Sequence, residues 1–220
     1  MILTTRSAAL VFCALLATGP GVAMAVEEAK YSVQMAEDEF ELRRYSPQIV
    51  AETLVTGAFD SVGNTGFKRL AGYIFGDNRS RDRVDMTAPV SQTPVSEKIA
   101  MTAPVNQQAV GEQAAGEQYR ITFIMPAGST LESLPEPTDA NVTLRELPAQ
   151  WMAAVRYSGT WSEARYRQWE ASLEAWVLEQ GWTPTGPPVF ARYNPPFMPW
   201  FMRRNEVLLP LQPVELQGAG

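Results

Sequence analysis

The feature that most constrains the fold of this 220-residue chain is an internal similarity between two segments 102 residues apart. Glu41-Leu42-Arg43 matches Thr143-Leu144-Arg145 at this spacing, and Gly57 likewise matches Gly159. Each matching stretch leads into a helix-like segment. We therefore predict two repeats, at about residues 39–126 and 141–211, with the same order of elements.

Two segments have the spacing of amphipathic helices, in which apolar residues recur at i, i+3, i+4 and i+7. Each ends near a glycine, Gly76 or Gly181, the residue that most often follows a helix C-terminus. The first stripe consists of Phe67, Leu70, Ala71 and Ile74, and the second of Tyr166, Trp169, Leu173, Trp176 and Val177.

Strand-like segments surround these helices, and the clearest alternate apolar with polar residues from Tyr119 to Met125 and from Trp151 to Ser158. Such alternation is typical of antiparallel strands with one face on the core. Each repeat therefore consists, in order, of a strand, a helix and two further strands. Two units predict an α+β fold with a mainly antiparallel sheet, curved or closed, that carries two helices. We interpret Asn106 to Gln118, rich in glutamine, alanine and glycine, as a mobile loop.

The N-terminus has the pattern of a cleavable secretory signal over residues 1–25, with one basic residue, an apolar run and a small-residue end at Ala23-Met24-Ala25. We expect residues 26–220 to form a single exported domain, periplasmic or secreted. No later segment is apolar for long enough to span a bilayer, so we expect no stable membrane span after cleavage.

Composition excludes several kinds of site. The chain has no histidine, and its one cysteine, Cys13, lies in the expected signal, so the mature protein would have neither imidazole nor thiol chemistry. The formal net charge of −6 disfavours nucleic acid as a partner. The sequence does not identify a protein partner.

One pentapeptide occurs twice, as Met86-Thr87-Ala88-Pro89-Val90 and as Met101-Thr102-Ala103-Pro104-Val105. Each copy ends a strand-like run with a proline, which cannot donate to a sheet ladder. We interpret one copy as a tandem duplication that lengthens a loop, and we expect the second copy, with the run from Lys98 to Val105, to enter the sheet.

These features together resemble the SOUL haem-binding protein family. The resemblance covers roughly Tyr31 to Leu211 and depends on residues 67–78, the Met-Thr-Ala-Pro-Val motif, Arg192-Tyr193-Asn194-Pro195-Pro196 and Arg203-Arg204-Asn205-Glu206-Val207. It implies a pseudo-symmetric, barrel-like sheet of duplicated β-α-β-β units with two helices, similar also to bacterial effector-binding domains of the gyrase-inhibitor type.

The resemblance further implies non-covalent binding of haem or another tetrapyrrole, for carriage or buffering, in an apolar groove between the first helix and a proline-rich segment. The groove would use Phe67, Leu70, Ala71, Ile74 and Met198. Arg203 and Arg204 could bind acidic groups of the ligand, although one of them could instead pair with Glu206.

Haem iron would have no histidine ligand here. Thioether and phenolate side chains also serve in haem proteins, so Met86, Met101 and Tyr193 are the weak candidates. Two other functions stay open. A carboxylate-dependent hydrolase of the effector-binding-domain type could use a pocket glutamate of raised pKa, and a protein-interaction scaffold could bind a partner's helix in the same groove.

Overall fold

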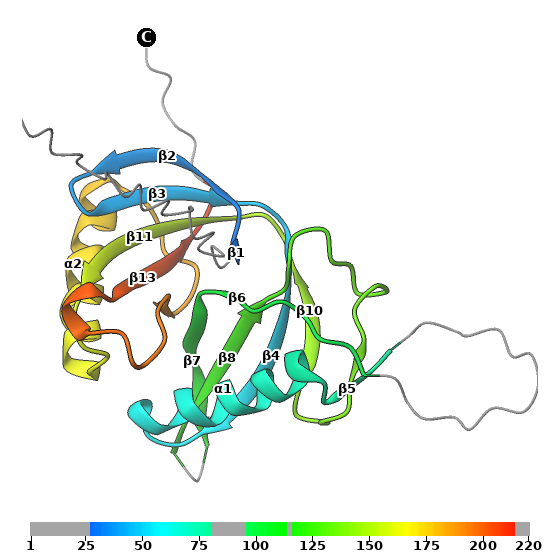
Figure 1. The fold of residues 1–220 in the computed structure, drawn as a ribbon. Helices are drawn as coiled ribbons and strands as arrows, with labels where there is room; N and C mark the ends of the chain where they lie inside the picture. The colour runs from blue at the N-terminus through cyan, green and yellow to red at the C-terminus, as the bar shows by residue number, and fades with distance from the viewer. Residues whose placement is uncertain (1–26, 81–95, 114–115, 214–220) are drawn as a thin grey trace, which may run out of the picture.

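The computed structural model describes residues 27–80, 96–113 and 116–213, and it confirms the predicted α+β fold. Nine strands form one curved, half-barrel sheet in which every pairing is antiparallel, in the order β10-β4-β8-β7-β12-β13-β11-β3-β2. Helices α1 (Phe59–Phe75) and α2 (Glu163–Glu179) lie on the outside of the curve (Figure 1). We call this side the outer face and the other side the inner face.

The first half of the chain contributes β2 (Tyr31–Glu37), β3 (Phe40–Tyr45), β4 (Gln48–Thr56), β7 (Val105–Gln113) and β8 (Gly116–Ile124). The second half of the chain contributes β10 (Thr143–Leu147), β11 (Gln150–Ser158), β12 (Val189–Arg192) and β13 (Arg204–Leu211). Two small ladders join β1 (Glu27–Glu28) to β6 (Thr102–Ala103) and β5 (Asn78–Arg79) to β9 (Glu136–Pro137), and a 3-10 turn, η1, spans Trp200–Met202.

The two predicted repeats are present, and each has one more strand than expected at its start: β3-β4-α1-β7-β8 and β10-β11-α2-β12-β13. The extra strands are exchanged. β3 of the first repeat pairs with β11 of the second, and β10 of the second pairs with β4 of the first. The halves are therefore interlocked at both sides of the sheet as well as joined in the middle through β7 and β12.

The hydrophobic core lies between the helices and the outer face of the sheet. At its centre the Phe59 ring packs edge-on against Tyr119, Tyr166 and Phe190, which brings α1, α2 and the middle strands together. At Gly66 a Cβ atom would lie only 2.4 Å from Cγ1 of Ile121. This glycine lets α1 approach β8 closely.

The prediction of a mobile loop from Asn106 to Gln118 is wrong. These residues form most of the β7–β8 hairpin, which pairs along its length with one register irregularity. The segment lacks the usual alternation of apolar residues because some of its strand positions are occupied by glutamines, whose side chains form hydrogen bonds to other parts of the chain. Buried Gln107 donates from Nε2 to the carbonyl of Phe59 over 3.2 Å, and Gln108 donates to the carbonyl of Pro187.

The second pentapeptide enters β structure as expected, because Thr102–Ala103 forms β6 and Val105 begins β7. The strand predicted from Lys98 is shorter, since regular pairing starts only at Thr102. The first pentapeptide and the expected signal lie outside the described residues. Within the described part of the chain, neither helix is long and apolar enough to span a membrane.

Candidate functional site

The inner face of the sheet holds a buried cluster of charged side chains that strand alternation places there. Side chains on a strand point alternately to opposite faces. Leu42 of β3 and Val207 of β13 therefore join the outer core, while Arg43 and Glu206 point inward. β11 runs between these two strands, and its small, fully buried Ala154 lies at the level between them, which leaves room for the two long side chains to meet.

Arg43 and Glu206 form a two-pronged ion pair. Nη1 of Arg43 donates to Oε2 of Glu206 over 2.6 Å, and Nη2 donates to Oε1 over 3.1 Å. The two side chains are 2% and 0% exposed. Arg43 also donates from Nε to Glu41 over 2.6 Å and from Nη1 to the Tyr45 hydroxyl over 3.2 Å. This geometry suits the fixed fork of a guanidinium, and it locks β3 to β13.

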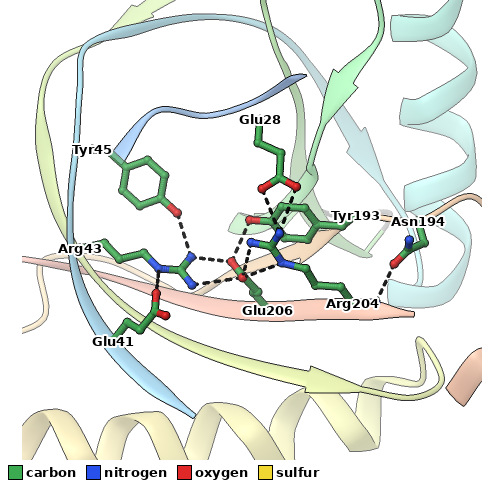
Figure 2. Close-up of polar contacts among 8 residues, drawn as sticks. All are labelled: Glu28, Glu41, Arg43, Tyr45, Tyr193, Asn194, Arg204 and Glu206. Carbon is green, nitrogen blue, oxygen red and sulfur yellow. Dashed lines mark hydrogen bonds and ion pairs between the residues drawn. The ribbon is translucent and has the colours of Figure 1, made fainter. Parts of the chain in front are cut away.

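A second arginine completes the charged network, which we define as Glu28, Glu41, Arg43, Tyr45, Tyr193, Arg204 and Glu206 (Figure 2). Arg204 donates from Nη2 to Oε1 of Glu206 over 2.8 Å and from Nη1 to both oxygens of Glu28. The Tyr193 hydroxyl donates to Oε2 of Glu206 over 2.8 Å. The sequence prediction that one of the two neighbouring arginines pairs with Glu206 is thus confirmed for Arg204.

These contacts decide the charge of Glu206. Burial by itself raises the pKa of a carboxyl group, but the hydrogen bonds and charge of Arg43, the charge of Arg204 and the Tyr193 hydroxyl hold the pKa of Glu206 below its ordinary value. Burial raises the pKa of the Tyr193 hydroxyl, so this tyrosine stays protonated. A general base needs a carboxylate with oxygens free for substrate, whereas both oxygens of Glu206 are occupied. The network acts as a structural clamp.

Acid should weaken this clamp. Because the pKa of Glu206 is lower in the folded than in the unfolded protein, its contribution is complete above the ordinary value of 4.5 and is lost as the pH falls through the folded pKa. We expect the free energy of unfolding of the parent protein to exceed that of Glu206→Gln at pH 7, and the difference to shrink below about pH 4.5. Urea unfolding at pH 7, 5, 4 and 3 measures it, and a difference that stays constant to pH 3 would contradict the assignment.

The predicted ligand-binding stripe on α1 lies mostly inside the protein. Leu70 and Ile74 are buried in the outer core, with Leu70 0% exposed. Phe67 and Ala71 are half-buried, and the Phe67 ring packs edge-on against Phe123 of β8 at 5.4 Å. The described residues thus leave no surface of Leu70 open to a ligand, and the binding role of this stripe stays a prediction.

The proline-rich segment, predicted as the other side of the groove, has an exposed surface. The connection from β12 to β13, residues 194–203, is here called the aromatic loop. Its most exposed large apolar side chain is Phe197, at 84%, and Met198 is half-buried. Several large apolar side chains exposed within one short loop are a feature of binding surfaces. The group consists of Phe197, Trp200, Phe201 and Met202.

Arg203 holds the aromatic loop in place. Its Nε donates to the carbonyl of Met198 and its Nη2 to the carbonyl of Pro196, both over 2.7 Å. Its guanidinium carbon lies 4.3 Å from the centre of the Trp161 ring, a cation–π contact. The structure therefore brings Met198 and Arg203 together, whereas Arg204 belongs to the charged network on the inner face.

The guanidinium group of Arg192, just before the aromatic loop, reaches the N-terminal half of α1. A Cβ atom at Gly63 would lie 2.8 Å from Nη1 of Arg192, the last residue of β12. Leu70 and Ile74 follow Gly63 by roughly 10 and 16 Å along the helix axis, at about 1.5 Å per residue.

The structure describes two of the three candidate iron ligands. Met86 is outside the described residues, Met101 is 40% exposed, and the Tyr193 hydroxyl is engaged by Glu206. Across residues 27–80, 96–113 and 116–213, no group of three or more Asp, Glu, His or Cys side chains is arranged to hold a metal ion. Iron coordination by any of these candidates stays a prediction.

Sequence reasoning missed Arg43 and Tyr45. The available signal was the alternation of Glu41, Arg43 and Tyr45 along one strand, which puts an acid, a base and a phenol on one face. Their partner Glu206 lies 163 residues away, so only the exchange of β3 into the second half of the sheet brings them together.

The half-barrel sheet with two outer helices and exchanged repeats defines a class of duplicated α+β proteins. Within this class the chain belongs to the SOUL heme-binding protein family, whose family model matches residues 26–210. The resemblance found in the sequence is thereby confirmed. No curated protein matches the chain closely enough to count as a relative.

Several solved structures share the fold at low sequence identity. The C-terminal domain of EcmrR aligns with a TM-score of 0.57 and 12% identity over 84% of this chain and 99% of that domain. A hydrolase from Listeria innocua aligns with a TM-score of 0.50 and 12% identity over 81% of this chain and 94% of its own. At such identity these likenesses concern the fold alone.

Proposed function

We propose that this protein binds haem or a related flat tetrapyrrole non-covalently on the aromatic loop, for carriage or buffering. Membership of the SOUL heme-binding family supports the class of ligand. The observation that carries the proposal is the exposed apolar surface of the aromatic loop, where four large side chains are between 58% and 84% exposed.

Covering this surface with a flat ligand would be favourable. Removing apolar surface from water gives roughly 25 cal/mol per Å², and an aromatic side chain can bury about 150–250 Å². The Trp200 and Phe201 rings lie perpendicular to each other, at 88°, with their centres 5.7 Å apart. A flat ligand could therefore stack on the face of one ring and contact the edge of the other. Because Arg203 already fixes the loop, little ordering cost remains on binding.

The residues present fit a tetrapyrrole bound mainly by shape. Haem would supply iron chemistry when bound, and the exposed thioether of Met202 is a side chain of the kind that can ligate it. Arg203 places positive charge at the base of the loop, where it would favour the acidic groups of the ligand. The half-buried Met198 would provide an apolar contact at the edge.

Titration with ferric haem and with metal-free protoporphyrin tests the proposal. We expect saturable binding of both, and we expect Trp200→Ala combined with Phe201→Ala to weaken it on the order of tenfold or more, because two apolar contacts are lost. Leu178→Ala is the matched control, since Leu178 is 70% exposed on α2 and should leave affinity unchanged.

The comparison of the two porphyrins separates modes of binding. Similar affinities mean that shape dominates, and a strong preference for the ferric form means that a thioether coordinates iron. Absence of saturable binding of either compound would refute the proposal.

We further propose that the protein acts outside the cytoplasm, in the periplasm or after secretion. This rests on the signal-like pattern of residues 1–25. Fractionation of cells that produce the full chain, with N-terminal sequencing of the product, tests both the location and cleavage near Val26.

A further inference from the structure

The inner face also contains a hollow that the proposed function does not use. It encloses about 220 Å³ and is lined by strands of both repeats, beside the charged network. None of the four exposed side chains of the aromatic loop lines it. Its polar lining includes Gln48, Asn106, Gln108, Arg120, Thr122 and Arg145.

Three polar atoms at this hollow are buried without a hydrogen-bond partner among the described residues: Oε1 of Gln48, Oδ1 of Asn106 and Nε of Arg120. The fourth such atom in the described part of the chain is the hydroxyl of Tyr157, which packs on α2 at the outer face. An unpartnered buried polar group costs about 1–3 kcal/mol, and native proteins contain few of them. Within the residues that the structure describes, the two amide oxygens have no hydrogen-bond partner, and Nε of Arg120 has only an ion-pair contact with Glu52, so the hollow has room for a group that would bond to all three atoms.

The charges around the hollow favour an anion. Two arginines line it, and Arg145 gives Nε and Nη2 hydrogen bonds to Oε2 of Glu52 over 3.0 and 2.8 Å. Arg120 Nε lies 3.4 Å from the same oxygen without forming a hydrogen bond. Among the described residues, the ion pairs of these two guanidinium groups share one carboxylate, so this group of three side chains has one positive charge in excess.

The two repeats differ at the position next to these arginines. At the 102-residue spacing Arg145 corresponds to Arg43, and Leu54 corresponds to Arg156. Leu54 is paired with Arg120 on β8 and Arg156 with Glu206 on β13, so Arg120 occupies the position that Glu206 has in the other repeat. In the charged network this position supplies a carboxylate to two arginines. At the hollow it supplies a further arginine instead. In the described part of the chain, Glu52 is the one carboxylate paired with the two arginines of the hollow, whereas Glu28, Glu41 and Glu206 pair with the two arginines of the charged network.

We infer that the hollow binds a small organic carboxylate that also carries hydroxyl or amine groups. Its carboxylate accepts a hydrogen bond from Nε of Arg120, and its hydroxyl or amine hydrogens are donated to Oε1 of Gln48 and Oδ1 of Asn106. The volume admits a compound of a few carbon atoms and excludes a tetrapyrrole. This site is therefore separate from the aromatic loop.

The test is calorimetric titration and thermal unfolding of the protein with L-malate and L-glutamate, with neutral succinamide for comparison. We expect saturable binding of at least one acid, no binding of succinamide, and a rise in Tm of roughly 5 °C at a hundred times Kd. Arg120→Gln should weaken binding by roughly tenfold to a hundredfold, because a charge-assisted hydrogen bond is lost. Arg167→Gln, on exposed α2, is the matched control and should bind as the parent does.

A second variant separates ligand binding from a structural water site. Asn106→Leu removes an unpartnered buried amide, so we expect it to lose binding while keeping or raising Tm without ligand. Retention of acid binding by the Trp200→Ala, Phe201→Ala protein is expected, which keeps this test independent of the porphyrin titration. The inference is overturned if neither acid binds, if Arg120→Gln binds as tightly as the parent, or if Asn106→Leu loses stability with no change in binding, as a water-filled hollow would give.

Discussion

Replacing Glu206 by alanine is expected to lower the free energy of unfolding by about 3–5 kcal/mol, a large part of the roughly 5–15 kcal/mol that stabilises a typical domain. The reason is the environment of its partner. Arg43 has a side chain only 2% exposed, and it would lose two of its hydrogen bonds while remaining charged. Urea unfolding at pH 7 measures the change.

Two comparisons make this prediction sharp. Glu163→Gln breaks an exposed pair with Arg167 on α2 and should cost no more than about 1 kcal/mol. The combination of Arg43→Met with Glu206→Leu should be less destabilised than Glu206→Ala, because no buried charge is left without a partner. If all three proteins unfold at the same urea concentration, the clamp contributes nothing.

Leu70→Asp is expected to prevent folding. Leu70 is fully buried where α1 packs on the sheet, so the substitution would both leave a cavity and place a carboxylate without partners in the core. The milder Leu70→Ala should lose about 2–5 kcal/mol and remain folded. Circular dichroism and urea unfolding give the result.

The matched control is Asn64→Asp, which introduces the same side chain at an exposed position of α1 and should fold as the parent does. A Leu70→Asp protein with the parent's circular dichroism and stability, but without porphyrin binding, would contradict the packing described here. It would show that the α1 stripe lines a ligand groove, as the sequence predicts.

The sequence predicts the fold well where the signal is local. The helical stripes and the alternation in β8 and β11 depend on neighbours a few residues apart, and both were found as expected. Strand β7 was missed because its residues are polar, and the partner of Gln107 is the Phe59 carbonyl, which only tertiary structure brings near. The exchange of β3 and β10 was missed for the same reason, since the residues of a strand do not show which distant strand it will join.

The candidate sites show the same division. The Arg204–Glu206 pair was predictable because the two residues are two apart on one strand and share a face. Arg43 joins them through long-range pairing, and the inner hollow combines polar side chains from both repeats, none of which forms a motif in the sequence. The apolar stripe of α1 suggested a ligand groove, but Leu70 and Ile74 pack into the core.

The exchange of β3 and β10 has a consequence for shorter chains. A polypeptide holding only the first repeat would leave the edges of β3, β4 and β7 without the neighbours that the second repeat provides. Open strand edges of this kind are readily completed by another chain. Such a half-length protein could pair all of these edges as a two-fold dimer that exchanges its first strands. The present chain therefore has the architecture of two similar subunits fused end to end.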